Sequence, residues 1–381
     1  MEKKKNVIKK AIFLSELFDT QAFVVPIKTT FYLSFFANVS DISLYKFLTV
    51  FVTFLCEIPL GYFSDKYGDR ITVLLSYFTS ILALFLMVLN PCNNIFIISN
   101  ILFGLSNALV SGAKNTYLIK VSEVYNFSYR EIKLKASGQK KIVELLMMTL
   151  SGFLFSINIF YPFVINITIY LFVLTLIVLL PKVRVENNEV SLSMMSKLLM
   201  KKIISDKKLL NEIIFYSITT TMLIINFDYY NVIFMRNQIN KGLYGLIYSC
   251  FMLINYLGIK LFNKAQKTNR IQYIVFLLLP LTFFMIITNN LYIVAIAIIL
   301  QQIAYAFIFI RFDIYLIDYV KNITQGTHFQ SLISFWYSIF KSIILFCISF
   351  SLKYMDLYCL YVFIAIILII SIYLYRGKNE V

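Results

Sequence analysis

The chain has 381 residues, 60% of them hydrophobic, and a mean hydropathy of +0.79. This is more apolar surface than a soluble domain can bury, so the composition excludes a water-soluble protein and indicates an integral membrane protein whose helices need about 20 apolar residues each. The net charge of +16 is better explained by membrane orientation than by a nucleic-acid partner, because the basic residues lie between apolar segments.

Apolar segments bounded by charged residues, Pro or Asn predict twelve transmembrane helices. They cover residues 11–34, 43–63, 71–89, 95–118, 138–157, 160–180, 209–234, 243–262, 271–288, 291–318, 329–352 and 357–375. The first follows a basic N-terminus, as in a signal peptide. Because Glu16 and Asp19 interrupt it and no small-residue cleavage site follows, we expect an uncleaved first helix.

The widest polar gap divides these spans six and six. We therefore expect an all-α integral membrane protein with an N-terminal six-helix bundle at 1–181 and a C-terminal six-helix bundle at 209–381. Between them, residues 182–208 are predicted to form a basic cytoplasmic linker with a short surface helix at 193–204.

Most Lys and Arg residues belong to loops on the same side of the membrane as the N-terminus. The opposite loops hold only Lys46, Arg236, Lys241 and Lys353. By the positive-inside rule, both termini are expected in the cytoplasm of a multi-pass protein of the cell membrane.

A polar island from Glu57 to Arg70 separates the second and third spans. Its glycines are expected to allow a sharp reversal, and its charges to lie just outside the hydrocarbon. The order Gly-x-x-x-Asp-Lys-x-Gly-x-Arg resembles the signature loop of the major facilitator superfamily (MFS), which joins helices 2 and 3 on the cytoplasmic side. The matching residues are Gly61, Asp65, Lys66, Gly68 and Arg70, preceded by Glu57-x-Pro59 as in a bacterial variant. Asp69 departs from the pattern, since the family usually has a second basic residue there.

The resemblance implies two six-helix pseudo-repeats and secondary active transport of a small molecule by alternating access. It also implies that Asp65 faces the start of helix 11 and links the halves when the cavity opens outward. His328, the only histidine, precedes that helix and is interpreted as a loop residue rather than a metal ligand. Lys114 and Arg311 are as far apart in the sequence as Gly61 and Gly258, which favours a repeat, although the second signature loop is degraded.

Two further spans carry small residues. Gly104, Ala108, Ser111 and Gly112 in the fourth span predict close helix packing. The fifth span has only Ser151-Gly152 where many drug/proton exporters of the family have a Gly- and Pro-rich motif, which disfavours drug/proton antiport.

Ionisable side chains inside a bilayer are costly, so they favour a water-filled cavity or a partner. They concentrate in spans 1, 4, 7 and 10, which line the central cavity in MFS transporters. These cavity and coupling candidates are Glu16, Asp19, Lys28, Lys114, Asp228, Arg311 and Asp313, with Glu144 and Lys341 outside the set.

The depth of each charge follows from the rise of about 1.5 Å per helical residue. Glu16 and Asp19 fall at the depth of Lys114, Arg311 and Asp313, which predicts a cluster toward the cytoplasm. Lys28 and Asp228 fall in the outer half and are expected to pair when the outer side of the cavity is shut. We hypothesise that Asp19 or Asp228 exchanges a proton during transport; the alternative is that these pairs only hold helices together.

The sequence contains no zinc-protease, hydrolase or Walker motif, and its five cysteines are scattered, so neither an enzyme nor a cofactor or metal site is expected. A transporter-like sensor or immunity protein and, less favoured, an integral-membrane enzyme are the alternatives. The 17% aromatic content is better explained by the overall bias toward Lys, Ile, Asn and Tyr than by a cavity lined with rings. Together with the bacterial look of the Glu57 variant, it is still the ground for expecting efflux of a hydrophobic or peptide-like molecule. The protein is expected to be a monomer whose partners are the bilayer, the substrate and possible protons.

Overall fold

A computed structural model describes residues 2–35, 37–111, 113–183, 205–265, 269–288, 290–320 and 326–377. In these ranges the regular secondary structure is helical, and no strand occurs in them. The helices are α1 (Glu2–Leu17), α2 (Lys28–Ser34), α3 (Val39–Tyr67), α4 (Asp69–Leu89), α5 (Asn93–Val110), α6 (Ala113–Val124), α7 (Tyr129–Ile157), α8 (Tyr161–Leu179), α10 (Lys207–Arg236), η1 (Lys241–Leu243), α11 (Tyr244–Ala265), α12 (Asn269–Ile286), α13 (Leu291–Val320), α14 (Gly326–Ser351) and α15 (Leu357–Gly377).

These helices match the twelve predicted spans if two pairs are each counted as one crossing. The pairs are α1 with α2 and α5 with α6. Within the described ranges, seven helical segments are long and apolar enough to cross a membrane by themselves, and α12, α14 and α15 contain shorter apolar stretches. The all-α membrane class predicted from the sequence is confirmed. The surface helix predicted at 193–204 lies outside the described residues.

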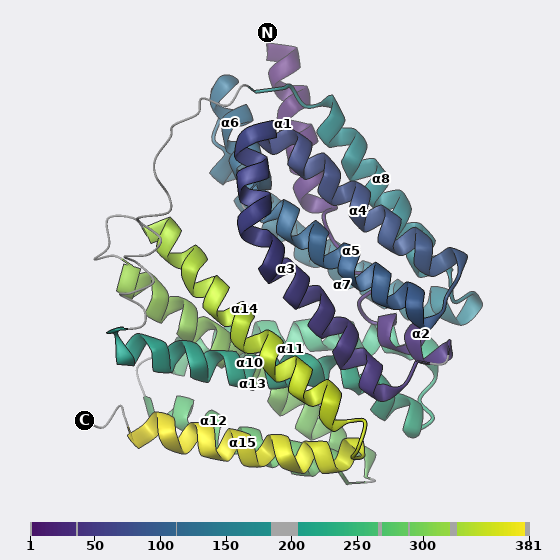
Figure 1. Cartoon of the computed structure of the whole chain (residues 1–381), viewed down its shortest axis with the longest axis vertical. Helices are drawn as coiled ribbons and strands as arrows, with labels where there is room; N and C mark the ends of the chain where they lie inside the picture. Colours follow the sequence, from purple (N-terminus) through teal and green to yellow (C-terminus); the bar gives the residue numbers. More distant parts are fainter. Residues whose placement is uncertain are drawn as a thin grey trace. The chain divides into compact units, whose positions relative to one another are not determined.

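The helices form two compact units. The first contains Met1–Asn38, Tyr45–Asn188 and Gln238–Ser249; the second contains Val39–Leu44, Glu189–Asn237 and Cys250–Val381. In the first unit α4 packs between α5 and α8, and the three run side by side in Figure 1. In the second, α12 packs against α13 and α15, while α10 packs against α13, α14 and α15. The domain boundaries at 181 and 208 stay a prediction.

The first crossing is broken, so the continuous helix predicted over 11–34 is wrong. α1 ends at Leu17, α2 begins at Lys28, and turns connect them. Pro26 lacks a backbone N–H and disfavours helical geometry at the residue before it, which accounts for the end of this break. Two carbonyls of the interrupted segment accept hydrogen bonds from α7: Asp19 from Lys140 Nζ at 2.5 Å, and Phe23 from Ser151 Oγ at 2.6 Å. These side chains replace helical partners that the hydrocarbon cannot supply.

The signature region is almost entirely helical, contrary to the loop expected between the second and third spans. Residues 57–67 belong to α3, and α4 begins at Asp69. Gly68 alone makes the reversal, with φ 96° and ψ 141°, a conformation that side-chain-bearing residues rarely adopt. Gly61, expected to take part in the turn, lies inside α3, and no atom lies within 4 Å of the place that a Cβ would take there.

Close helix contacts occur where glycines lie. A Cβ on Gly104 would be 2.7 Å from the Thr49 carbonyl of α3, and Thr53 Oγ1 donates to the Gly104 carbonyl at 3.0 Å. The packing predicted for the fourth span is therefore confirmed at Gly104, whereas Gly112 lies outside the described residues. In the first unit α7 and the start of α11 approach even more closely, since a Cβ on Gly245 would overlap the Met148 carbonyl.

Candidate functional site

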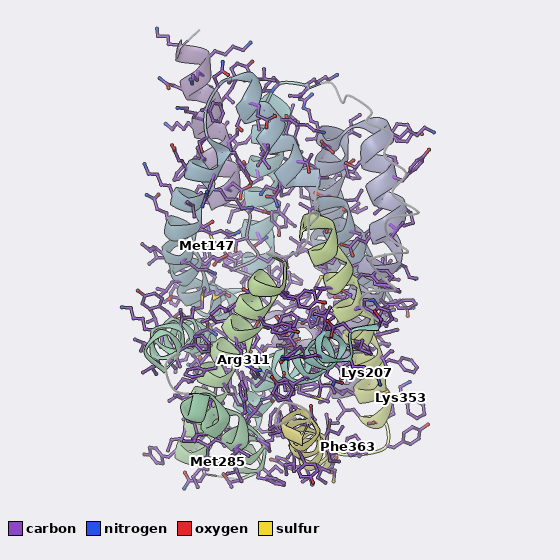
Figure 2. All side chains as sticks on the ribbon, turned by 90° about the vertical axis from the view of Figure 1, so that its left-hand side faces the viewer. Met147, Lys207, Met285, Arg311, Lys353 and Phe363 are labelled. Atoms are coloured by element: carbon purple, nitrogen blue, oxygen red, sulfur yellow. The ribbon has the colours of Figure 1, made fainter. Side chains whose placement is uncertain are left out.

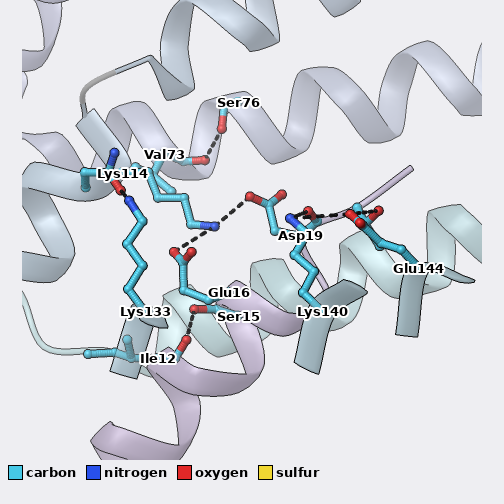
Figure 3. A network of polar contacts seen from close by, with 12 residues as sticks. Ile12, Ser15, Glu16, Asp19, Val73, Ser76, Lys114, Lys133, Lys140 and Glu144 are labelled. Carbon is cyan, nitrogen blue, oxygen red and sulfur yellow. Dashed lines mark hydrogen bonds and ion pairs between the residues drawn. The ribbon is translucent and has the colours of Figure 1, made fainter. Parts of the chain in front are cut away.

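Lys114 is the centre of a buried ionic cluster in the first unit. It projects from the first turn of α6, just after the interruption between α5 and α6, and is 6% exposed. Its Nζ lies 2.6 Å from Asp19 Oδ2 and 3.1 Å from Glu16 Oε1. Figure 3 shows the ammonium group between the two carboxylates, one from the end of α1 and one from the break that follows it. The predicted cluster is thus present for these three residues.

Neutral and basic groups from α6 and α7 surround the Glu16 side of this cluster. The Tyr129 hydroxyl lies 3.4 Å from Glu16 Oε1 and donates to Asn115 Oδ1 at 3.0 Å. Lys133 Nζ donates to the same amide oxygen at 2.8 Å. Glu16 is therefore connected through one phenol and one amide to the more exposed end of α7.

Glu144, which the sequence left outside the candidate set, lies on the other side of the helix break. Its Oε1 accepts from Thr20 Oγ1 at 3.0 Å, and its carboxylate pairs with Lys141 at 3.3 Å and Lys140 at 3.9 Å. Lys140 therefore joins Glu144 to the Asp19 carbonyl, as Figure 3 shows. Glu144 holds the break against α7 and belongs to the same polar network as the cluster.

Asp69, the residue that departs from the signature pattern, makes the shortest ionic contact of that region. It is 7% exposed, and its Oδ2 lies 2.7 Å from Lys120 Nζ on α6. Its Oδ1 accepts from Ser64 Oγ at 2.8 Å. An acid at this position therefore ties the start of α4 to α6, the helix that also carries Lys114.

The remaining signature residues make separate contacts. Arg70 Nη2 donates to the Val178 carbonyl at the end of α8 at 2.5 Å, and Glu57 accepts from Ser111 Oγ at 3.1 Å. Lys66 is exposed near the Tyr67 ring. The side chains of Asp65 and His328 lie outside what the structure describes, so the link of Asp65 to helix 11 stays a prediction.

The second unit holds a related ionic pair between its first and fourth helices. Arg311 Nη2 on α13 lies 3.3 Å from Glu212 Oε1 on α10. The Tyr375 hydroxyl on α15 donates to the same carboxylate oxygen at 2.5 Å and contacts the Arg311 guanidinium, which also lies over the Phe276 ring. Figure 2 labels Arg311 on α13. Each unit thus joins a glutamate of its first helix to a cation of its fourth span.

Comparison with known proteins establishes the family. The sequence model described as Major Facilitator Superfamily matches residues 12–346. The chain belongs to the Major Facilitator Superfamily. A curated relative in Bacillus subtilis (strain 168), "Uncharacterized MFS-type transporter YxaM", is 34% identical over 116 residues, which is 30% of this chain and only 28% of that relative.

Solved MFS structures share the fold along nearly the whole chain. Nucleoside transporter NupG has a TM-score of 0.75 at 13% identity, covering 99% of each chain, and a mutant of that transporter has 0.77, covering 98% of this chain and 99% of that one. A D-xylose-proton symporter has a TM-score of 0.64 at 13% identity, with 96% of each chain covered. The predicted MFS fold is confirmed, and the family points to a membrane transporter rather than an enzyme.

Other candidates of this MFS protein remain apart from the cluster and the pair. Lys28 Nζ lies 3.3 Å from Asn100 Oδ1 and 4.3 Å from the centre of the Phe103 ring. Its predicted pairing with Asp228 stays a prediction, because the two residues belong to different units. Asp313 is exposed and is not part of the Arg311 pair.

Glu212 is the functional candidate that sequence reasoning missed in this MFS chain. It lies at the edge of the predicted seventh span, where an acid is ordinarily solvated. Its position in the sequence could have revealed it, because Glu212 precedes Arg311 by almost the same number of residues as Glu16 precedes Lys114. No group of three His, Cys, Asp or Glu side chains is placed to hold a metal ion within the described ranges.

Proposed function

We propose that this MFS protein is a proton-coupled secondary transporter of a small molecule, and that the Glu16, Asp19 and Lys114 cluster is where the proton binds. The observation that carries the proposal is the sharing of one buried ammonium group by two carboxylates. Those three side chains carry one more negative than positive charge. Lys140, Lys141 and Glu144 beside them add one positive charge, so the whole network is balanced. A proton binds when one of the two carboxylates loses its contact with Lys114 in these low-dielectric surroundings.

The position of Asp19 supports a link between protonation and movement. Asp19 lies in the break between α1 and α2, whereas Lys114 lies on α6. A protonated Asp19 loses most of its attraction to Lys114, which weakens the contact between the broken segment and α6. Interrupted helices in transporters are a recurrent location for substrate and ion sites, because their backbone groups are not all used within the helix.

The pair in the second unit contains one carboxylate rather than two. Glu212 faces one guanidinium and one phenol, so its ionised form is already compensated. We therefore assign it a holding role between α10 and α13. The proposal keeps Asp19 from the sequence-based choice between Asp19 and Asp228 and adds its neighbour Glu16.

Everted membrane vesicles from overproducing cells test the proposal. A proton gradient is established, and the quenching of a pH-sensitive acridine dye is followed while candidate compounds are added. Nucleosides and pentoses are the first probes, because the neighbouring structures are named as transporters of such compounds. Secreted peptides and toxic hydrophobic compounds form the second set, since efflux of such molecules was predicted from the aromatic content.

We expect at least one probe to dissipate the gradient only in vesicles containing the protein. Asp19→Asn and Glu16→Gln are expected to abolish that proton movement while unlabelled-for-labelled substrate exchange persists. Lys353→Gln, at an exposed lysine of the second unit, is the matched control and should leave both signals unchanged. Gradient-driven transport that survives in both carboxylate variants would contradict the coupling role. No movement of any probe, in either direction, would favour the sensor-like alternative.

A further inference from the structure

An apolar groove opens on the second unit between α10 and α15. Its volume is about 340 Å³, and it is lined by Asn211, Ile214, Phe215, Ile218, Ile367, Ile370, Ser371 and Tyr375. At roughly 30 Å³ for each water-sized group, this space holds about eleven such groups, which suits one hydrocarbon chain rather than a whole lipid. The apolar lining makes filling by water unfavourable.

The α10 wall of the groove is one helical stripe that begins with a lysine. Asn211, Ile214 and Ile218 follow Lys207 at intervals of four, three and four residues, so they share a face of the helix. Lys207 and Lys208 are both exposed at the start of α10, and Figure 2 labels Lys207 there. The groove is therefore apolar along its length, and beyond one end it has two lysines against the single carboxylate of the cap residue Asp206.

We infer that this groove binds one acyl chain of an anionic phospholipid, with the headgroup phosphate at Lys207 and Lys208. In the orientation expected from the positive-inside rule, the start of α10 faces the cytoplasm, where the membrane surface is negatively charged. A zwitterionic lipid offers the same chain without the net charge, so the two lysines select the anionic headgroup.

The occupied groove contacts the ionic pair of the second unit through two rings. Phe215 and Tyr375 both line the groove and stack on each other, with ring centres 4.3 Å apart. The Tyr375 hydroxyl also donates to Glu212 Oε1. A chain that packs against the Tyr375 ring holds its hydroxyl toward Glu212, so the lipid stabilises the contacts between α10, α13 and α15.

Native mass spectrometry of the purified full-length protein tests the site, with phosphatidylglycerol and phosphatidylcholine titrated separately. We expect one tightly held phosphatidylglycerol molecule. Ile370→Trp fills the groove and should remove it, whereas Ile369→Trp should not, because Ile369 is equally exposed, at 51% against 53%, but does not line the groove. Lys207→Gln and Lys208→Gln should each lower affinity about fivefold, and Lys353→Gln should not change it.

Three results would overturn the inference. The first is that folded Ile370→Trp keeps the bound phosphatidylglycerol, and the second is that the protein binds phosphatidylcholine with equal affinity. The third is that the molecule lost from Ile370→Trp has the mass of a compound that is not a lipid. If Ile370→Trp does not yield folded protein, the Lys207→Gln/Lys208→Gln double variant decides, since both residues are exposed. An unchanged affinity in that variant would exclude headgroup recognition at the start of α10.

Discussion

Lys114 Nζ lies 2.6 Å from Asp19 Oδ2, so a buried cation on α6 is held by an acid in the non-helical segment that follows α1. This contact depends on the helix break. In a continuous first helix, the direction of the Asp19 side chain would be set by helical periodicity alone. Glu16, one turn earlier, reaches the same ammonium from the last turn of α1.

Removing the cation should strongly destabilise the first unit. Lys114→Met leaves two buried carboxylates without their counter-charge, and breaking a buried ion pair typically costs about 3–5 kcal/mol. Thermal unfolding in detergent, followed by fluorescence-detected size exclusion, should show a much lower midpoint for Lys114→Met. Adding Glu16→Gln and Asp19→Asn to that variant should recover most of the loss. A Lys114→Met midpoint equal to that of the exposed-site control Lys353→Met would show that the cluster does not stabilise the fold.

The unusual acid of the signature region should be coupled to Lys120. Asp69→Lys places two cations together and leaves Ser64 without its acceptor, so it should destabilise the protein by about 1–3 kcal/mol. The reversed pair Asp69→Lys/Lys120→Asp should be more stable than the sum of the two single effects predicts. A double-mutant cycle on unfolding midpoints measures this coupling. Strict additivity would mean that the 2.7 Å contact contributes no interaction free energy.

Two glycines of the first unit should respond oppositely to alanine. Gly245→Ala would drive a Cβ into the Met148 carbonyl, forcing α7 and α11 apart, and should destabilise by at least about 1–3 kcal/mol. Gly138→Ala, in helical α7 with nothing within 4 Å of its Cβ position, should stabilise by about 0.5–1 kcal/mol. The same direction of change at both positions would be inconsistent with the close α7–α11 contact.

The cap of α10 should make a small, pH-dependent contribution to stability. Burial by itself raises the pKa of Asp206, but hydrogen bonds from Tyr319 and from the Leu209 and Lys208 N–H groups outweigh it and lower the pKa below the ordinary 3.8. Because the folded pKa is below the unfolded value, the stabilisation is complete at neutral pH and is lost as the pH falls through the folded pKa. Asp206→Asn keeps a capping side chain but loses the charge. At neutral pH the free energy of unfolding of this variant should therefore be lower than that of the wild type by about 0.3–1 kcal/mol, and the difference should vanish in acid. A deficit that is the same at both pH values would contradict this.

Most of the twelve spans could be predicted because a bilayer requires long apolar helices, and seven of the described helical segments meet that requirement by themselves. The break at 18–27 could not, because Ala22-Phe23-Val24-Val25 continues the apolar run and only Pro26 signals an end. The meeting of Glu16, Asp19 and Lys114 followed from their depth and from the family resemblance, which places spans 1 and 4 around one cavity. The part of that cluster that would include Arg311 and Asp313 stays a prediction, because these two residues belong to the other unit. The other contacts of the cluster could not be predicted. The positions of Glu144, Lys140 and the Asp69–Lys120 pair depend on which helices are neighbours. Glu212 was missed because it lies at the end of an apolar segment.

The most direct test of proton binding at this cluster is an infrared titration of the buried carboxylates, because it needs no substrate. Attenuated-total-reflection spectra of the protein in lipid are recorded from alkaline to mildly acidic conditions, and the carbonyl band of protonated carboxylic acids is followed. We predict that one such band of a buried acid appears in the wild type and is absent in the Glu16→Gln/Asp19→Asn double variant, while Glu212→Gln retains it. An identical band in the double variant, or none in the wild type, would contradict a proton-binding role for this cluster.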